Sequence, residues 1–116
     1  MGEQGSAERR LSPRFPPRDG TRVGCRRGTI GLGRDLALSV VELSETGLRL
    51  LLNEPLEHGQ MVEVTLSPPG GGPEVRRLGL VMWARGDRDG ECQAGVQFSE
   101  RLSPEALRDL CQLPEG

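Results

Sequence analysis

The chain has 116 residues, a length typical of one compact domain rather than two. Apolar residues make up 34% of it, and with two Phe, one Trp and no Tyr the core must be largely aliphatic. So few rings argue against an aromatic cage or a base-stacking platform. Seventeen Gly and nine Pro predict many turns and short elements, which favours β structure.

The net charge of −2 is unevenly distributed along the chain. Residues 1–34 hold eight Arg and three acidic residues, a net +5, so the remainder carries −7. The basic end predicts an anionic ligand, whereas the acidic remainder argues against a nucleic-acid polymer.

Cysteine usage and hydropathy indicate the cellular compartment of the protein. Cys25, Cys92 and Cys111 are an odd number without a C-x-x-C pair or a neighbouring His, which predicts reduced thiols and no zinc site. No apolar run approaches the ~20 residues of a membrane span, and the N-terminal region has no signal-peptide stretch. We therefore expect a cytoplasmic protein with no membrane insertion.

The predicted elements follow one another as short strands separated by turns. Residues 1–20 are rich in Gly, Ser, Pro and Arg and predict a flexible basic arm. Beyond it, strands are expected over the ranges 36–43, 47–52, 62–67, 75–84 and 93–98, after a further β-like run that begins at Thr21. The strands at 36–43 and 47–52 should pair, and so should those at 62–67 and 75–84. Alternation within 75–84 puts Trp83 on the same face as Val81. Trp83, the only Trp, is expected to pack in the core, and a contact surface is the alternative interpretation.

Near the C-terminus the pattern changes to that of a short helix. Ser103 can cap it and Pro104 suits its first position, while Leu107, Leu110 and Cys111 fall on one face. Strands at this spacing with no helix between them predict an all-β fold, a small six-stranded antiparallel β-barrel followed by a short α-helix. The expected boundaries are 1–20 for the arm, 21–112 for the barrel with its helix, and 113–116 for a tail.

Two arginines of the arm form the first candidate motif. Arg10 and Arg14 lie four residues apart in a segment that Pro13 keeps from being helical. A guanidinium group is planar, permanently charged and forked, so it can grip a phosphate, stack on a purine or donate to the O6/N7 edge of guanine. The spacing recurs at Arg14 and Arg18, so a solvated basic tail is the alternative interpretation.

The second candidate motif is residues 42–47, where the expected strand 36–43 connects to the expected strand 47–52. Ser44 can offer a hydroxyl to a ligand, and Gly47 allows a positive φ or a close approach to a ligand. A plain turn without a ligand is the alternative interpretation. Two further features predict no chemistry: residues 28–33 are a glycine-rich loop, and His58, which is the only His, is expected at the surface.

In this order the two motifs resemble those of the PilZ domain family, R-x-x-x-R in an N-terminal arm and [D/N]-x-S-x-x-G in the barrel. The likeness covers about residues 8–111 and implies a PilZ-like β-barrel that senses the bacterial second messenger cyclic di-GMP. The departure is Glu42, where the family has Asp or Asn. Glutamate is one methylene longer, so a misplaced carboxylate would weaken binding about ten- to hundredfold.

The resemblance also implies roles for particular residues. The implied ligand-binding residues are Arg9, Arg10, Arg14, Glu42, Ser44 and Gly47. We expect a receptor and adaptor rather than an enzyme, without a cofactor, which orders its arm on cyclic di-GMP and signals to an unidentified protein partner. That mechanism requires arginines that native carboxylates leave free. The alternative is a degenerate PilZ module that does not bind cyclic di-GMP and acts as a constitutive protein-interaction adaptor.

Overall fold

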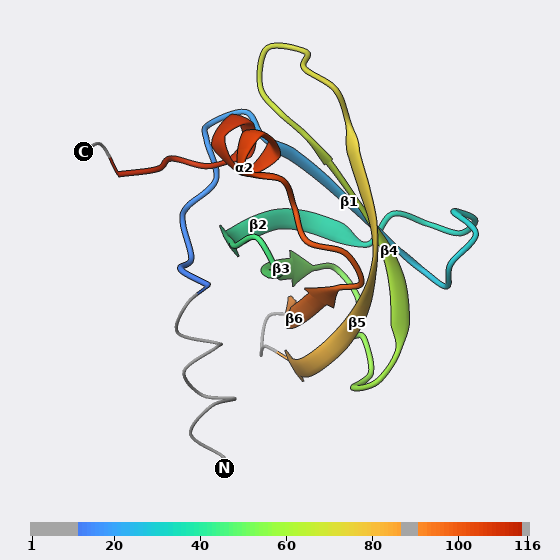
Figure 1. Cartoon of the computed structure of the whole chain (residues 1–116). Helices are drawn as coiled ribbons and strands as arrows, with labels where there is room; N and C mark the ends of the chain where they lie inside the picture. The colour runs from blue at the N-terminus through green and yellow to red at the C-terminus, as the bar shows by residue number, and fades with distance from the viewer. Residues whose placement is uncertain (1–11, 87–90, 115–116) are drawn as a thin grey trace.

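The computed structural model describes residues 12–86 and 91–114. Within them the elements are β1 (Arg22–Arg27), β2 (Ala37–Leu43), β3 (Gly47–Leu52), β4 (Met61–Ser67), β5 (Val75–Gly86), β6 (Cys92–Phe98) and α2 (Pro104–Leu110). Neighbouring strands are antiparallel in the order β1-β4-β5-β6-β3-β2. The outer strands approach each other, and the Leu36 N–H donates to the Cys25 carbonyl at 2.8 Å. The sheet is therefore a nearly closed six-stranded barrel, as predicted (Figure 1).

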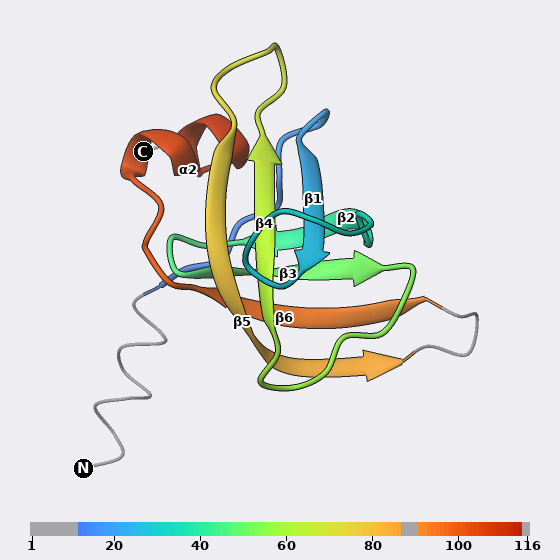
Figure 2. The same ribbon diagram turned by 90° about the vertical axis from the view of Figure 1, so that its right-hand side faces the viewer.

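Both predicted strand pairs are confirmed, since β2 pairs with β3 and β4 pairs with β5. The long strand β5 pairs with β4 through its first half and with β6 through its second, and it curves between the two (Figure 2). The barrel encloses an aliphatic core, as the composition requires. Its largest fully buried side chains are Leu36, Leu43, Leu50, Leu52, Leu66, Leu110, Val62, Val64 and Val81.

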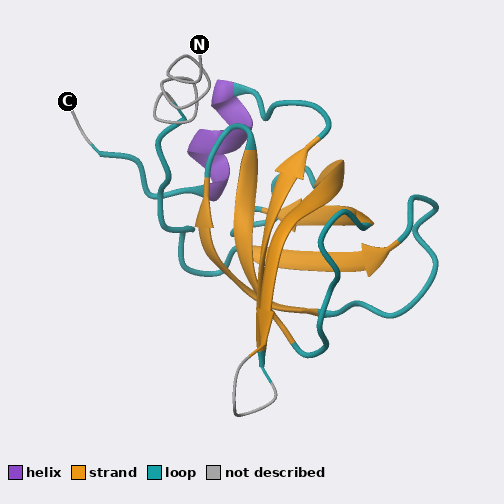
Figure 3. Cartoon of the chain, turned by 90° about the horizontal axis from the view of Figure 1, so that it is seen from below, coloured by secondary structure: helices purple, strands orange, loops and turns teal. Residues whose placement is uncertain are grey.

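The predicted C-terminal helix is confirmed, and it lies against one end of the sheet (Figure 3). The Ser103 hydroxyl accepts the N–H of Ala106 at 3.0 Å, which satisfies a donor of the first turn. Leu110 and Cys111 are fully buried against the core. Among the described residues no helix has the length and apolar character needed to cross a bilayer.

Residues 12–20 of the predicted arm are bonded to the barrel. Phe15 and Leu43 exchange two backbone hydrogen bonds of 2.8 and 2.9 Å, which lays the arm along β2. Beyond Phe15, the Arg18 N–H donates to the Leu110 carbonyl at 2.8 Å, at the C-terminal end of α2. Residues 1–11 lie outside the described residues. The flexibility and the boundary expected for the arm stay predictions for measurement in solution.

The prediction that Trp83 lies in the core is wrong. The register of β5 against β6 shifts between Val81, which pairs with Val96, and Trp83, which pairs with Gly95. Such a bulge inserts one residue and reverses the alternation that follows it. Val81 remains buried, whereas Trp83 is half-buried on the outer side of the barrel. Alternation alone cannot locate a bulge, so the sequence pattern wrongly placed Val81 and Trp83 on one face.

Candidate ligand-binding site

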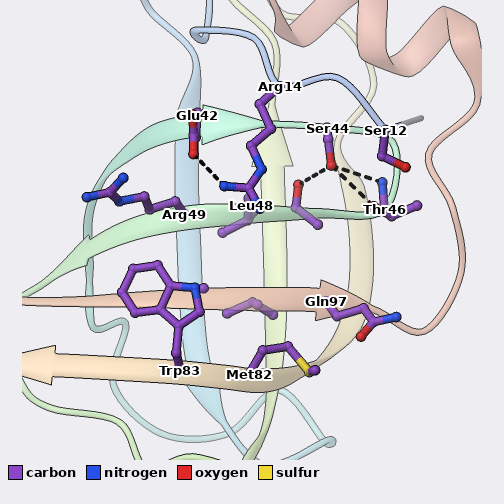
Figure 4. A pocket seen from close by; sticks show the side chains of 13 residues that line it. Ser12, Arg14, Glu42, Ser44, Thr46, Leu48, Arg49, Met82, Trp83 and Gln97 are labelled. Atoms are coloured by element: carbon purple, nitrogen blue, oxygen red, sulfur yellow. Dashed lines mark hydrogen bonds and ion pairs between the residues drawn. The ribbon is translucent and has the colours of Figure 1, made fainter. Parts of the chain in front are cut away.

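A cavity of about 350 Å³ opens on the outer side of the barrel, over β3, β6 and β5 and beside the arm (Figure 4). The residues that line it are Ser12, Arg14, Glu42, Ser44, Thr46, Gly47, Leu48, Arg49, Met82, Trp83, Gly95, Val96 and Gln97. Four of the residues singled out in the two sequence motifs thus line one cavity. The other two, Arg9 and Arg10, lie outside the described residues.

Arg14 and Glu42 meet at the mouth of this cavity (Figure 4). Arg14 Nη1 donates to Glu42 Oε1 at 3.0 Å, and the two side chains are 65% and 28% exposed. Glu42 also stands opposite Arg49 in the register of β2 and β3. Among the described residues that line the cavity these are the three charged ones, so the net lining charge is +1. The cavity therefore favours an anion.

The requirement for arginines without a native carboxylate partner is not met at Arg14. Its side chain is nevertheless 65% exposed, and exposed ion pairs contribute only ~0.2–1 kcal/mol. A charge-assisted hydrogen bond to a phosphate contributes ~1.5–3 kcal/mol. The ion pair of Arg14 with Glu42 is therefore weaker than a charge-assisted hydrogen bond between a guanidinium and a phosphate.

Ser44 is 5% exposed and belongs to the tight turn between β2 and β3. Its Oγ accepts the Thr46 N–H at 3.2 Å, and its own N–H donates to the Gly47 carbonyl at 2.8 Å. The hydroxyl thus stabilises the turn, which is the plain alternative, while lining the cavity. Its contact with a ligand stays a prediction.

Gly47 is required for a different reason from the one expected. It does not adopt a positive φ, so that part of the expectation is wrong. A Cβ at this position would instead collide with the backbone carbonyl of Val96 in the paired strand β6. Gly47 therefore allows β3 and β6 to approach each other closely beneath the cavity.

Sequence reasoning missed the aromatic and cationic wall of the site. The Trp83 indole covers Gly95, where a Cβ would lie 2.5 Å from Cε2 of the ring. The guanidinium groups of Arg49 and Arg85 lie 5.6 and 5.1 Å from the ring centroid. Arg49 is fixed by two donations to Gln93 Oε1, at 3.0 and 2.8 Å. The available signal was a glycine inside an apolar strand, which often marks the close approach of another group.

The cavity therefore combines planar cations, hydroxyls and one aromatic ring. One ring suffices to stack one base, although the composition argued against a larger platform. Among the described residues no group of three or more His, Cys, Asp or Glu is placed to hold a metal ion. This chemistry fits a planar ligand that carries negative charge.

A family model described as PilZ domain matches residues 8–113, which include both sequence motifs, the barrel and its helix. No curated protein shows significant similarity to the chain.

Proposed function

Because the chain belongs to the PilZ domain family, whose members bind cyclic di-GMP as a ligand, we propose that it is a cyclic di-GMP receptor that signals to a protein partner. PilZ domains are binding domains rather than catalytic ones. The single observation that supports the proposal most is the shared cavity, where Arg14 of the arm faces Glu42 and Ser44 of the barrel.

We expect the ligand to be held by the cations of the cavity and of the arm. Arg14 exchanges the Glu42 carboxylate for a phosphate, and Arg10, with Arg9 as an auxiliary, binds the remaining phosphate or guanine edge. Trp83 lines the same cavity and offers its ring to a guanine base. Both guanidinium groups near the ring add positive charge where the phosphates would lie.

The signal follows from the way in which the arm is attached. Phe15 is hydrogen-bonded to Leu43, so Arg14 is the residue just before a fixed point of the chain. A ligand bound to Arg14 and to the barrel orders the residues that precede Phe15 over the cavity. The ordered arm and the ligand form a surface that a partner distinguishes from the unliganded one, which shifts the population towards the bound state.

The fluorescence of Trp83 tests this proposal directly, because the chain has one Trp and it lines the cavity. Cyclic di-GMP should produce a saturable change in emission, and GMP at the same concentration a much weaker one. Arg14→Ala should abolish the response. A native protein whose emission is unaffected by cyclic di-GMP up to ~100 μM would contradict the receptor function, since a charge-assisted site of this kind gives micromolar affinity.

The Arg14–Glu42 ion pair also favours the second candidate, a constitutive adaptor, since it satisfies the cation without a ligand. The Glu42→Asp variant distinguishes the receptor function from the adaptor function. In a receptor the shorter carboxylate restores the family's residue, and affinity for cyclic di-GMP should rise. In an adaptor, partner-dependent function survives Arg14→Ala and no titration shows binding in either the native protein or the Asp variant.

A further inference from the structure

A second groove lies on another part of the barrel, over β1, β4 and β5. It encloses about 520 Å³, and the loop between β1 and β2 borders it through Ile30 and Gly31. This loop extends away from the barrel (Figure 1). The groove shares no lining residue with the proposed cyclic di-GMP site.

Glu63 on β4 is the unusual residue of the groove. It is only 8% exposed, and its carboxylate makes no hydrogen bond or ion pair with any residue within 12–86 or 91–114. The carboxylate lies beneath the loop, where a Cβ on Gly31 would be 3.0 Å from Glu63 Oε1. Its oxygens keep contact with the solvent of the groove, because no fully buried side-chain oxygen or nitrogen of the described residues lacks a hydrogen-bond partner. A cation that entered the groove would therefore reach a carboxylate that is open on the groove side and has little competing water around it.

Two of the arginines that line the groove have other partners. Arg26 stands opposite Glu63 in the register of β1 and β4, but its Nε donates to the Gly33 carbonyl at 3.2 Å. Arg76 lies 3.8 Å from Glu74. The charged residues that line the groove are Arg22, Arg26, Arg76, Asp35, Glu63 and Glu74. They balance, so no overall positive charge opposes a cation at Glu63.

The groove also offers acceptors beyond the carboxylate. Thr65 and Ser67 follow Glu63 on the same face of β4, because side chains alternate along a strand, and both line the groove. A guanidinium group matches this set better than an ammonium group. Its forked donors fit a carboxylate bidentately. A guanidinium group is also more weakly hydrated than an ammonium group, so it loses less hydration free energy on entering a buried site.

The loop beside the groove indicates how such a cation is presented. Ile30 and Leu32 are 74% and 68% exposed, the highest values among the exposed large hydrophobic residues of the described chain. Ile30 lines the groove itself. Apolar side chains in this position can pack on the residues next to an inserted arginine, whereas a small free cation would leave them in water. We propose that this groove binds an arginine side chain of a protein partner, with its guanidinium on Glu63 and its apolar neighbours on Ile30 and Leu32.

The test is an NMR titration of the full chain with capped arginine, N-acetyl-arginine-N-methylamide, and with its neutral isostere, the capped citrulline. Capped arginine should shift the amides of Gly31, Glu63 and Thr65 saturably, and capped citrulline should not. Glu63→Gln should weaken binding about tenfold or more, as expected for a lost charge-assisted contact. This variant should fold normally because the carboxylate has no partner to lose, and Glu105→Gln, on the exposed first turn of α2, is the matched control.

A peptide with leucines flanking its arginine should bind more tightly than capped arginine, and Ile30→Ser with Leu32→Ser should remove that gain. Three outcomes would overturn the proposal: no saturable shift with capped arginine, equal binding of citrulline, or unchanged affinity in Glu63→Gln. Binding seen only in Arg26→Gln would do so as well, because it would show that Arg26 neutralises Glu63 in solution. Failure of cyclic di-GMP to bind would leave these outcomes unaffected.

Discussion

The indole of Trp83 in β5 covers Gly95 in β6 so closely that a side chain at position 95 would occupy the same space as the ring. This contact depends on the bulge after Val81, which brings Trp83 to the outer side of the barrel. It fixes the ring at the edge of the candidate cyclic di-GMP cavity, where the guanidinium groups of Arg49 and Arg85 lie 5.6 and 5.1 Å from the ring centroid. The relationship therefore connects an irregularity of the sheet to the shape of the site.

Gly95→Ala should displace the indole and weaken binding of cyclic di-GMP. The free energy of unfolding should fall by about 1–3 kcal/mol, the usual cost of overpacking, because the ring can move away only in part. Chemical denaturation and the emission maximum of Trp83 measure both effects. Gly86→Ala is the matched control in β5, since a Cβ there would meet nothing within 4 Å. Equal emission spectra for native protein and Gly95→Ala would show that the ring does not depend on this contact.

Gly47→Ala should destabilise the barrel more than Gly95→Ala does. The added Cβ would meet the carbonyl of Val96, which belongs to the backbone of the paired strand and cannot rotate away as a side chain can. We expect a loss of about 3 kcal/mol in the free energy of unfolding, the upper end of the usual overpacking range. Urea denaturation of the two variants side by side decides the order. A variant as stable as native protein would mean that the strands separate easily here.

Arg14 and Glu42 should contribute little to stability, in contrast to these glycines. A double-mutant cycle with Arg14→Ala and Glu42→Gln should give a coupling energy of about 0.2–1 kcal/mol, because the pair is exposed and screened by water. Denaturation at low and high salt measures the coupling, which should decrease with salt. A coupling above about 2 kcal/mol would mean that a phosphate cannot compete for Arg14 as we infer.

The sequence predicted the regular parts of this fold because their signals are local. The cap at Ser103 followed by Pro104 placed the start of α2 correctly, and alternation with turn residues placed the paired strands. The bulge before Trp83 has no comparable local signal. It is set by the register between β5 and β6, which only the assembled sheet defines.

The candidate site was predictable to the same extent. Arg14, Ser44 and Gly47 were recognised as a motif, and the structure brings them to one cavity. Their physical roles were not evident, because the ion pair of Arg14 and the contact of Gly47 with Val96 join residues distant in sequence. Arg49 was missed for the same reason, since its place beside Trp83 follows from the pairing of β3 and β5 with β6.

Two buried thiols should make the protein less stable at alkaline pH. Burial raises the pKa of Cys25 from 9.0 to about 12 and that of Cys111 to about 11. Above pH 9 the unfolded chain releases these protons while the folded chain keeps them, so stability falls with increasing pH until the folded thiols ionise. Each thiol contributes a slope of up to ~1.4 kcal/mol per pH unit.

This chain allows a clean measurement of that effect, because it contains no Lys and no Tyr whose ionisation would overlap. Denaturation between pH 8.5 and 10.5 should show the decline in the free energy of unfolding. In Cys25→Ala the slope of this free energy against pH should be smaller by the contribution of about one proton. A slope that is identical in the variant would contradict the protonated, buried state of Cys25.

Calorimetric titration of the native protein with cyclic di-GMP, repeated on Arg14→Ala, tests the central claim most directly. The account predicts saturable heat with one class of site in the native protein and none in the variant, although the variant unfolds within about 1 kcal/mol of native. No heat in the native protein near ~100 μM ligand, or equal affinity in the variant, would contradict a receptor in which Arg14 exchanges Glu42 for a phosphate.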